Sequence, residues 1–296
     1  MKHRSILAAT LILCCVTVGL FADEPAPIKT LIVDGAQQYH KYLETTPVLE
    51  ETLEASGRFT VDVLTSTVPE GDDAYRPAFE EYDLVVVNEG FGASPWPRAT
   101  EEAFEAYVAG GGGVVVYHAA NNSWPDWEEY NKMSAVGGWG GRNETSGPYL
   151  YLNEEGEAVR DDSPGKGGGH GAQREYEIRV RQSEHPIMQG LPETFLHGPD
   201  ELYAFLRGPA ENVTILASAH SRLDNKGSGR EEPMLMVIEY GEGRIFHTVL
   251  GHHVSQIQEG SFVTTLLRGA EWAATGEVTI PVPEDFPNQA YPPTGE

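Results

Sequence analysis

The chain has 296 residues, with 45 acidic against 20 basic side chains and a formal net charge of −25. A surface this negative repels phosphate backbones and anionic lipids, which excludes nucleic-acid binding as the main function. The length is enough for one domain with a large core. Both cysteines, Cys14 and Cys15, lie near the start of the chain. The rest therefore has no disulfide, thiol nucleophile or thiolate metal ligand.

Residues 1–22 have the pattern of a secretory signal peptide. Lys2 and Arg4 precede an apolar run over 6–21, and 20–22 resemble a cleavage site. The run is short for a membrane span, so an uncleaved anchor or a lipid anchor on either cysteine is the less favoured alternative. No later segment is apolar enough to cross a bilayer. We expect an exported protein, periplasmic or extracellular.

Strand and helix patterns alternate through the first half of the remaining chain. Apolar runs predict buried strands at 28–33, 83–88 and 114–117, and a further strand is predicted at 59–64. Thr46 and Pro47 are typical of a helix N-cap and first turn, and Gly57 ends that helix. Thr100 is expected to cap a second helix, which ends at the glycines 110–113. This alternation predicts one doubly wound domain, with a mostly parallel sheet and helices on both faces.

The alternation breaks over residues 121–172, which we call the lid. Trp124, Trp127 and Trp139 lie there among paired glycines with little periodicity. Long irregular stretches inside compact domains are often functional. The tryptophans favour an ordered lid that is inserted into the domain.

Regular patterns return after the lid. Strands are predicted at 175–181, 213–219, 234–239 and 244–250, the last two joined by a tight turn at 241–243. Ser261 is expected to cap a final helix that Gly276 ends. We therefore divide the chain into a signal peptide (1–22), one α/β domain (23–276) and a proline-rich tail (277–296) that wraps the surface.

Polar residues follow several of the predicted strands. In open parallel sheets, ligands bind beyond the carboxyl ends of the strands, near the point where strand order reverses. The residues at those ends include Asp34, His40, Asn88, Glu89, His118, Asn121, Asn122, His252 and His253. If the sheet is as predicted, they converge on one edge.

An ordered set of motifs resembles the ThuA-like, trehalose-utilisation family. The set comprises 114–120 after a glycine run, 185–187 with 190–192, 200–203, 241–244 with 250–252, and 268–274. The match extends over about residues 28 to 275. It implies a flavodoxin-like sheet of the class I glutamine-amidotransferase type, and a role in the metabolism of disaccharides or glycosides.

The chain departs from the amidotransferases at one position. Their nucleophilic cysteine lies on a sharp strand-to-helix turn, where this sequence has His118. Without a cysteine, thiol acyl transfer is ruled out. No Gly-x-Ser-x-Gly motif follows a strand, so serine hydrolysis is also poorly supported.

Histidines and carboxylates remain as the candidates for chemistry. His118, His185 and His252 fall in the family motifs, and His170 lies in a glycine-rich loop. Neutral imidazoles from separate loops can bind a divalent metal. We expect His118, His170 and His252 as ligands of Zn²⁺, Mn²⁺ or Ca²⁺, and no nucleotide cofactor. The alternative is structural, because the chain has no tight ligand pair and His185 before Pro186 could simply cap a turn. The remaining histidines, His197, His220 and His247, are expected to be structural or on the surface.

Asp200 and Glu201 are a second pair of candidates. One of them could serve as a base or accept hydrogen bonds from sugar hydroxyls; alternatively, one pairs with Arg142 or Arg174 to fix the lid. The candidate substrate-binding residues are His40, Asn121, Asn122, Trp124, Trp139, Tyr203 and His253. The tryptophans could stack on sugar faces or pack within the lid.

Three functions remain open. The first is an enzyme, a hydrolase or lyase, that cleaves glycosides or disaccharides oxidised at C3, with His118 or His252 as base and His170 or His185 as electrophile or metal ligand. The second is a non-catalytic sugar-binding or scaffold module. The third is ordinary two-carboxylate glycoside hydrolysis, for which Asp34, Glu89, Asp200 and Glu201 are the available carboxylates. The expected partner is a small sugar, and no sequence pattern indicates an oligomeric state.

Overall fold

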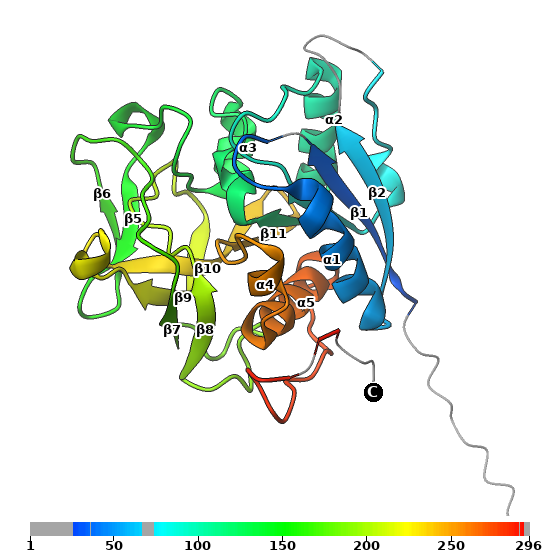
Figure 1. Ribbon diagram of the computed structural model, residues 1–296. Coiled ribbons are helices and arrows are strands. Elements are labelled where there is room, and N and C mark those ends of the chain that lie inside the picture. Colours follow the sequence, from blue (N-terminus) through cyan, green and yellow to red (C-terminus); the bar gives the residue numbers. More distant parts are fainter. Residues whose placement is uncertain (1–25, 36, 67–73, 290, 293–296) are drawn as a thin grey trace, which may run out of the picture.

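One mixed sheet with helices on both faces forms the centre of the protein (Figure 1). The computed structural model describes residues 26–35, 37–66, 74–289 and 291–292. Its strands are β1 Ile28–Gly35, β2 Phe59–Ser66, β3 Leu84–Asn88, β4 Gly113–Tyr117, β5 Tyr149–Leu152, β6 Ala158–Asp161, β7 Arg174–Val180, β8 Thr194–Asp200, β9 Val213–His220, β10 Glu231–Tyr240 and β11 Gly243–Thr248. Its helices are α1 Tyr42–Ala55, α2 Arg98–Ala109, α3 Glu128–Ser134, α4 Val254–Ile257 and α5 Gly260–Thr275.

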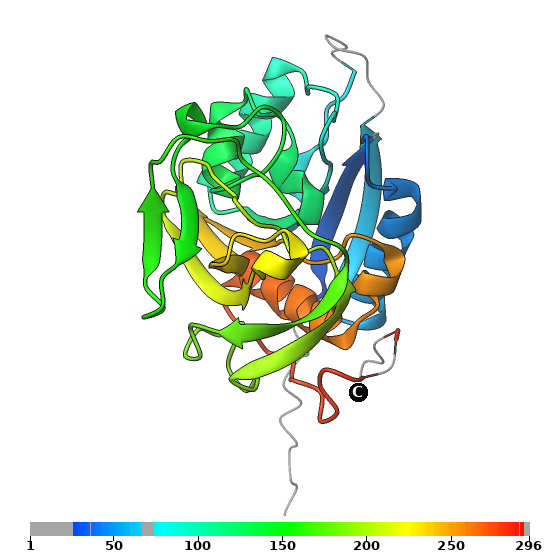
Figure 2. The ribbon, with the colours of Figure 1, turned by 60° about the vertical axis from the view of Figure 1, so that its left-hand side comes forward.

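The sheet has a parallel half and an antiparallel half. The strand order is β2-β1-β3-β4-β11-β10-β9-β7-β8, and every pair from β2 to β11 is parallel. From β11 to β8 every pair is antiparallel. The predicted α/β fold is confirmed, including the tight turn between β10 and β11. Strand β8 and the β5–β6 hairpin were not predicted from the sequence. Figure 2 shows this hairpin at the side of the molecule.

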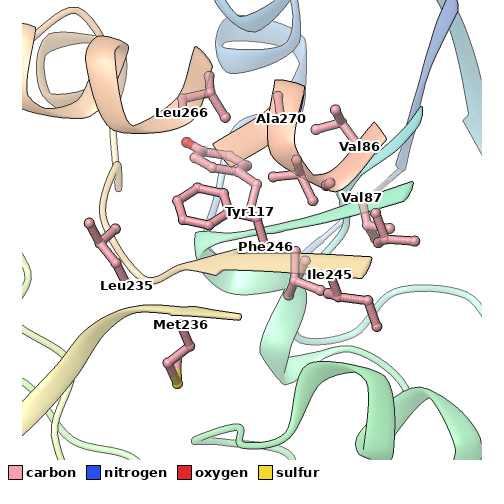
Figure 3. Packing of buried hydrophobic residues seen from close by; sticks show 14 of the residues in the cluster. Val86, Val87, Tyr117, Leu235, Met236, Ile245, Phe246, Leu266 and Ala270 are labelled. Carbon is pink, nitrogen blue, oxygen red and sulfur yellow. The ribbon is translucent and has the colours of Figure 1, made fainter. Parts of the chain in front are cut away.

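The apolar strands are buried because helices cover both faces of the sheet. Helices α1 and α5 pack on one face, and α2 and α3 pack on the other. In Figure 3, Tyr117 and Phe246 lie under α5, near Leu266, while Met236 points to the opposite face. Helix α5 approaches closely, since a Cβ on Gly269 would lie 2.2 Å from the Phe246 ring. Burial of such side chains contributes about 1.5–3 kcal/mol each.

Three residues predicted as N-caps lie inside helices instead. Helix α1 begins at Tyr42, ahead of Thr46 and Pro47, and α2 and α5 begin at Arg98 and Gly260. The reason is tertiary hydrogen bonding. The hydroxyl of Thr46 donates to Oδ2 of Asp34 (2.5 Å), and that of Thr100 donates to the Tyr75 carbonyl (2.5 Å). Ser261 Oγ lies 2.8 Å from Nδ1 of His197.

The lid is ordered around a buried arginine. It contains α3, β5 and β6, and Arg207 lies beneath it with no exposed surface. The guanidinium donates to the carbonyls of Gly147 (2.8 Å), Ser163 (3.3 Å) and Gly165 (2.7 Å), and it lies 4.0 Å from the centre of the Tyr149 ring. A charged group buried in this way fixes the carbonyls that it contacts.

The two ends of the chain differ in how far the structure describes them. The predicted signal peptide lies outside the described residues. Among the described helices, none has the length and apolar character that a bilayer crossing requires. In the tail, Thr279 and Ile280 donate backbone hydrogen bonds to Glu271 on α5, and the Tyr291 hydroxyl donates to Glu51 on α1. The tail therefore runs along the helices of one face.

Replacing Arg207 by leucine tests the role of the buried guanidinium. The substitution leaves three carbonyls without their donor, so we expect the free energy of unfolding to fall by about 3 kcal/mol. Urea denaturation measures this. The matched control is Arg98→Leu, because Arg98 pairs with glutamates at the surface and its loss should cost less than about 1 kcal/mol. Equal losses in the two variants would contradict the assignment.

Candidate functional site

His118 lies on a strained turn at the end of β4. Its φ is 44°, in the left-handed region, and a short 3-10 helix, His118–Asn122, follows at once. A non-glycine residue in this conformation costs on the order of 1–3 kcal/mol and is common at active sites. Nδ1 of His118 lies 2.7 Å from the Val249 carbonyl and therefore carries the proton. The unprotonated Nε2 faces the site.

Three imidazoles and one carboxylate converge on His118 Nε2. One ligand atom from each of His40, His118, Glu201 and His252 lies within 4.8 Å of the others. The Nε2 atoms of His40 and His118 are 3.2 Å apart, and the Tyr203 hydroxyl lies 2.9 Å from His118 Nε2. The four residues come from the loop before α1, the end of β4, the end of β8 and the end of β11. We call them the His-Glu cluster.

Burial keeps two imidazoles of the cluster, those of His118 and His40, neutral. It lowers the pKa of His118 to about 4, and burial together with the neighbouring rings lowers the pKa of His40 to about 2. Burial alone would raise the pKa of Glu201, but the adjacent His252 holds it below its ordinary value. Nδ1 of His252 lies 3.0 Å from Oε2 of Glu201, without the alignment of a hydrogen bond. At neutral pH the cluster thus offers the neutral nitrogens of His118 and His40 and the ionised carboxylate of Glu201.

Asp200 fixes two segments of the cluster in place. Its Oδ2 accepts hydrogen bonds from His197 Nε2 (2.9 Å) and from the Gly251 amide (2.7 Å). Its Oδ1 accepts from the amides of Glu201 (2.8 Å) and His252 (3.2 Å). Burial would raise the pKa of Asp200, but these donors hold it at about 2. Asp200 is therefore a positioning residue for Glu201 and His252.

The cluster lies in a cavity of about 360 Å³, which we call the histidine pocket. This volume lies near the lower end of the range for small-molecule sites. The pocket is lined by Tyr39, His40, Phe91, Asn122, Trp139, His170, Glu201, Tyr203 and His252. His118 is 1% exposed and lies behind this surface.

His170 stands at the rim of the pocket, outside the cluster. Its Nδ1 lies 2.8 Å from the Gly171 carbonyl and 3.6 Å from Oε1 of Glu201. Because Nδ1 faces a carbonyl, the tautomer protonated at Nδ1 is favoured, and in that tautomer Nε2 is the nitrogen that can accept a proton. Trp139 packs between His170 and Tyr203, with ring centres 5.9 and 4.8 Å away. An imidazole here can exchange protons with a ligand in the pocket.

The donor set of the cluster suits a transition metal. Imidazole nitrogens are typical ligands of Zn²⁺ and its neighbours, whereas Ca²⁺ takes oxygen ligands. Among the described residues, no group forms a hydrogen bond with the buried Nδ1 of His40. The Val249 carbonyl orients His118, as second-sphere groups commonly orient metal-binding imidazoles. Of the expected ligands, His118 and His252 lie in the cluster together with His40 and Glu201, whereas His170 lies outside it.

The structure places three predicted site residues elsewhere. His185 packs on Trp272 (4.9 Å between ring centres), and its Nδ1 accepts from the Ile187 amide (3.3 Å), so it caps a turn. Asn121 is fully buried, with Nδ2 3.1 Å from Nε2 of His247, so it is structural. Trp124 packs on Trp96, Trp127 and Tyr130 within the domain and lies outside the histidine pocket.

The remaining predictions lie in or next to the pocket. Asn122, Trp139 and Tyr203 line it, while His253 is exposed with its ring 4.0 Å from His252. The alternative that an arginine pairs with Asp200 or Glu201 is wrong, because Arg142 binds lid carbonyls and the Asn131 side chain. Arg174 faces Asp224 instead.

Sequence reasoning missed three residues that shape the site. Tyr39 and Phe91 stack on each other at the rim, with ring centres 5.9 Å apart. His197 is buried against Asp200. Both aromatics follow strand ends, so the rule that found His40 and Glu89 applied to them as well. The three-residue spacing of His197 and Asp200 did not indicate that His197 contacts the site, because strand β8, which contains both residues, was not predicted.

Comparisons with known proteins agree with this fold. The family model described as trehalose utilisation (ThuA) matches residues 29–273. A ThuA-like protein structure from Parabacteroides merdae ATCC 43184 is 46% identical with a TM-score of 0.84, and the match covers 89% of this chain and 95% of that chain. Another, from Bacteroides uniformis ATCC 8492, is 19% identical with a TM-score of 0.57 over 86% and 95%, a likeness of fold alone. No curated protein matches the chain significantly.

Two buried carboxyl groups lie at the ends of β1 and β3. Asp34 is 2% exposed and Glu89 is 1% exposed, and neither lines the histidine pocket. Both oxygens of Glu89 lack a hydrogen-bond partner among the described residues. Burial, and then the nearby Asp34, raise the pKa of Glu89 well above its ordinary value despite the adjacent Trp96 indole. Glu89 is therefore protonated in the folded protein under conditions in which an exposed glutamate is ionised.

Glu89→Gln tests this protonation. Because the folded-state pKa is raised, the contribution of Glu89 to stability is complete below about pH 4.3 and is lost as pH rises through the folded pKa, by about 1.4 kcal/mol per unit of difference. Glutamine does not ionise, so the variant should gain stability relative to the parent between pH 5 and pH 8 in urea denaturation. Glu54→Gln, at an exposed position of α1, is the control. Parallel pH curves for Glu89→Gln and the parent would refute the prediction.

Proposed function

Because the chain belongs to the ThuA trehalose-utilisation family, we propose that it is an exported enzyme that cleaves glycosides or disaccharides oxidised at C3. The His-Glu cluster, three of whose residues line the histidine pocket, is the observation that supports this proposal. The proposal includes a divalent metal held by His40, His118, His252 and Glu201. Zn²⁺ or Mn²⁺ fits this donor set better than Ca²⁺.

The histidines divide into two roles in this proposal. His40, His118 and His252 belong to the His-Glu cluster, so in this proposal these three are ligands of the metal. His40 and His252 line the pocket, and His118 lies behind its surface. His170 lines the pocket outside the cluster, with Nδ1 turned to the Gly171 carbonyl, and Nε2 of its neutral ring serves as the base. Burial raises the pKa of Tyr203, so its hydroxyl stays protonated and can donate to a substrate oxygen. Trp139 supplies an aromatic surface beside both.

The proposed reaction is a β-elimination. A ketone at C3 acidifies the proton on C2, and Nε2 of His170 removes that proton. The electron pair forms the C1–C2 double bond as the bond between C1 and the leaving oxygen breaks. The imidazolium then returns its proton to the leaving oxygen, which balances the step. A bound divalent cation would supply the positive charge that stabilises the enediolate-like transition state.

The pocket supports this chemistry better than two-carboxylate hydrolysis. Among the described residues that line it, Glu201 is the single carboxylate. The neighbouring Asp200 is fully engaged by four donors. Asp34 and Glu89 lie outside the lining, so no pair of free carboxylates faces a sugar there, as that mechanism requires.

Elemental analysis of the purified protein tests the metal. After incubation with Zn²⁺ or Mn²⁺ and dialysis, we expect about one ion per chain in the parent, and less than a tenth of that in His252→Ala or His40→Ala. His185→Ala, which changes a histidine outside the pocket, is the matched control and should keep its ion. Circular dichroism establishes that each variant is folded. A parent without metal, or equal metal in all variants, would exclude the site.

Turnover of a 3-keto-glucoside with a chromogenic leaving group tests the reaction. We expect His170→Ala to lower kcat by about 10²-fold or more while its metal content is unchanged, because loss of a general base costs 10²–10⁴ in rate. His220→Ala, at an exposed position outside the pocket, should behave like the parent. Saturable sugar binding without turnover by the metal-loaded parent would instead identify a binding module.

A further inference from the structure

A second, larger cavity adjoins the histidine pocket. Its volume is about 790 Å³, and we call it the outer groove. The two cavities share Phe91 and Asn122 in their lining. The outer groove is therefore a continuation of the histidine pocket over the lid side of the sheet. The His-Glu cluster, which is the reacting end of the proposed site, lies in the smaller cavity alone.

The walls of the outer groove are ordered by hydrogen bonds. Arg142 donates to the Trp139 carbonyl (2.8 Å) and to Oδ1 of Asn131 (2.7 Å), which fixes the lid segment that contains Gly140 and Gly141. Oδ1 of Asn122 accepts from the amides of Gly138 and Trp139 at 2.8 and 3.2 Å. The two cavities are thus joined by side chains and lid backbone that are held in fixed positions.

The floor of the outer groove is aromatic. Trp124 and Trp127 are each 6% exposed, and their indole N–H groups are already bound, to the Ser94 carbonyl (2.9 Å) and Oε1 of Glu105 (2.8 Å). The small part of each residue that reaches the groove therefore offers apolar contact rather than a hydrogen-bond donor. Phe91 adds a third ring at the junction of the two cavities. Aromatic surface of this kind favours sugar rings and other flat apolar faces.

The rim of the outer groove is acidic. Asp126, Glu128 and Glu101 line it, and Arg98 is the cation among the described lining residues. The Arg98 guanidinium already contacts Glu101, Glu102 and Glu105 at 3.1 Å each. A carboxylate or phosphate entering the groove would meet this excess of negative charge. The field therefore selects against anionic ligands.

We propose that the outer groove binds the leaving part of the substrate, a neutral or cationic group longer than one sugar unit. This inference rests on the proposed function, since it takes the cleaved bond to lie at the His-Glu cluster. The oxidised sugar occupies the histidine pocket, and the leaving group extends past Phe91 and Asn122 along Trp124 and Trp127. The substrate class is then glycosides with extended uncharged or basic leaving groups, in preference to simple methyl glycosides.

Three 3-keto-glucosides measure this preference in the metal-loaded parent: one with a methyl leaving group, one with a neutral disaccharide, and one with a disaccharide that ends in a uronic acid. We expect kcat/KM to be at least 10-fold higher for the neutral disaccharide than for methyl. The uronic acid should lower kcat/KM at least 5-fold relative to the neutral disaccharide.

The double variant Asp126→Lys/Glu128→Lys should abolish the penalty for the uronic acid. Its control is Glu184→Lys/Glu193→Lys, which makes the same change of charge at exposed positions outside both cavities. Equal kcat/KM for methyl and neutral disaccharide, or an unchanged penalty in the double variant, overturns this inference alone. Absence of turnover on all three substrates overturns the proposed function and this inference with it.

Discussion

The candidate site depends on the hydrogen bonds that the buried carboxylate of Asp200 accepts. One carboxylate at the end of β8 accepts four hydrogen bonds, two of them from the backbone of the turn after β11. Burying an ion costs several kcal/mol unless its lone pairs are satisfied. Here His197 and the amides satisfy them, so the two segments are held together. The side chains of Glu201 and His252 are brought face to face as a result, without contacting the carboxylate that positions them.

The central strands β1, β3 and β4 could be predicted from the sequence because they are continuous apolar runs, whereas β8 and the β5–β6 hairpin could not. The same reading placed His118 and His252 at strand ends on one edge, which is where they lie. The positions of helix starts were not readable. A hydroxyl such as that of Thr46 can cap a helix or bind a distant carboxylate, and only the tertiary neighbour decides which. The consequence is that α1 begins earlier than expected, at Tyr42, two residues after His40.

The membership of the site was readable only in part. His170 and His185 were equal candidates in the sequence, since spacing says nothing about where a loop leads. His170 lies at the rim of the pocket, close to Glu201, whereas His185 lies on a turn that packs it against Trp272 on α5. Trp124 was expected beside the histidines, but the aromatic residues around it hold it at the neighbouring cavity. Such outcomes depend on packing between segments far apart in the chain.

The boundary between the two halves of the sheet has a consequence for cohesion. His40 and His118 belong to the parallel half, Glu201 follows the last antiparallel strand, and His252 follows β11 at the boundary. An ion bound by these four residues would link the two halves of the sheet across that boundary. Any motion that separates the two halves would first have to break the bonds between the ion and its ligands. The junction between the halves would therefore become more rigid as more of the sites are occupied by an ion. A ligand that binds the folded state at a thousand times its Kd adds about 4 kcal/mol to stability, and here that gain would fall on the junction between the two halves.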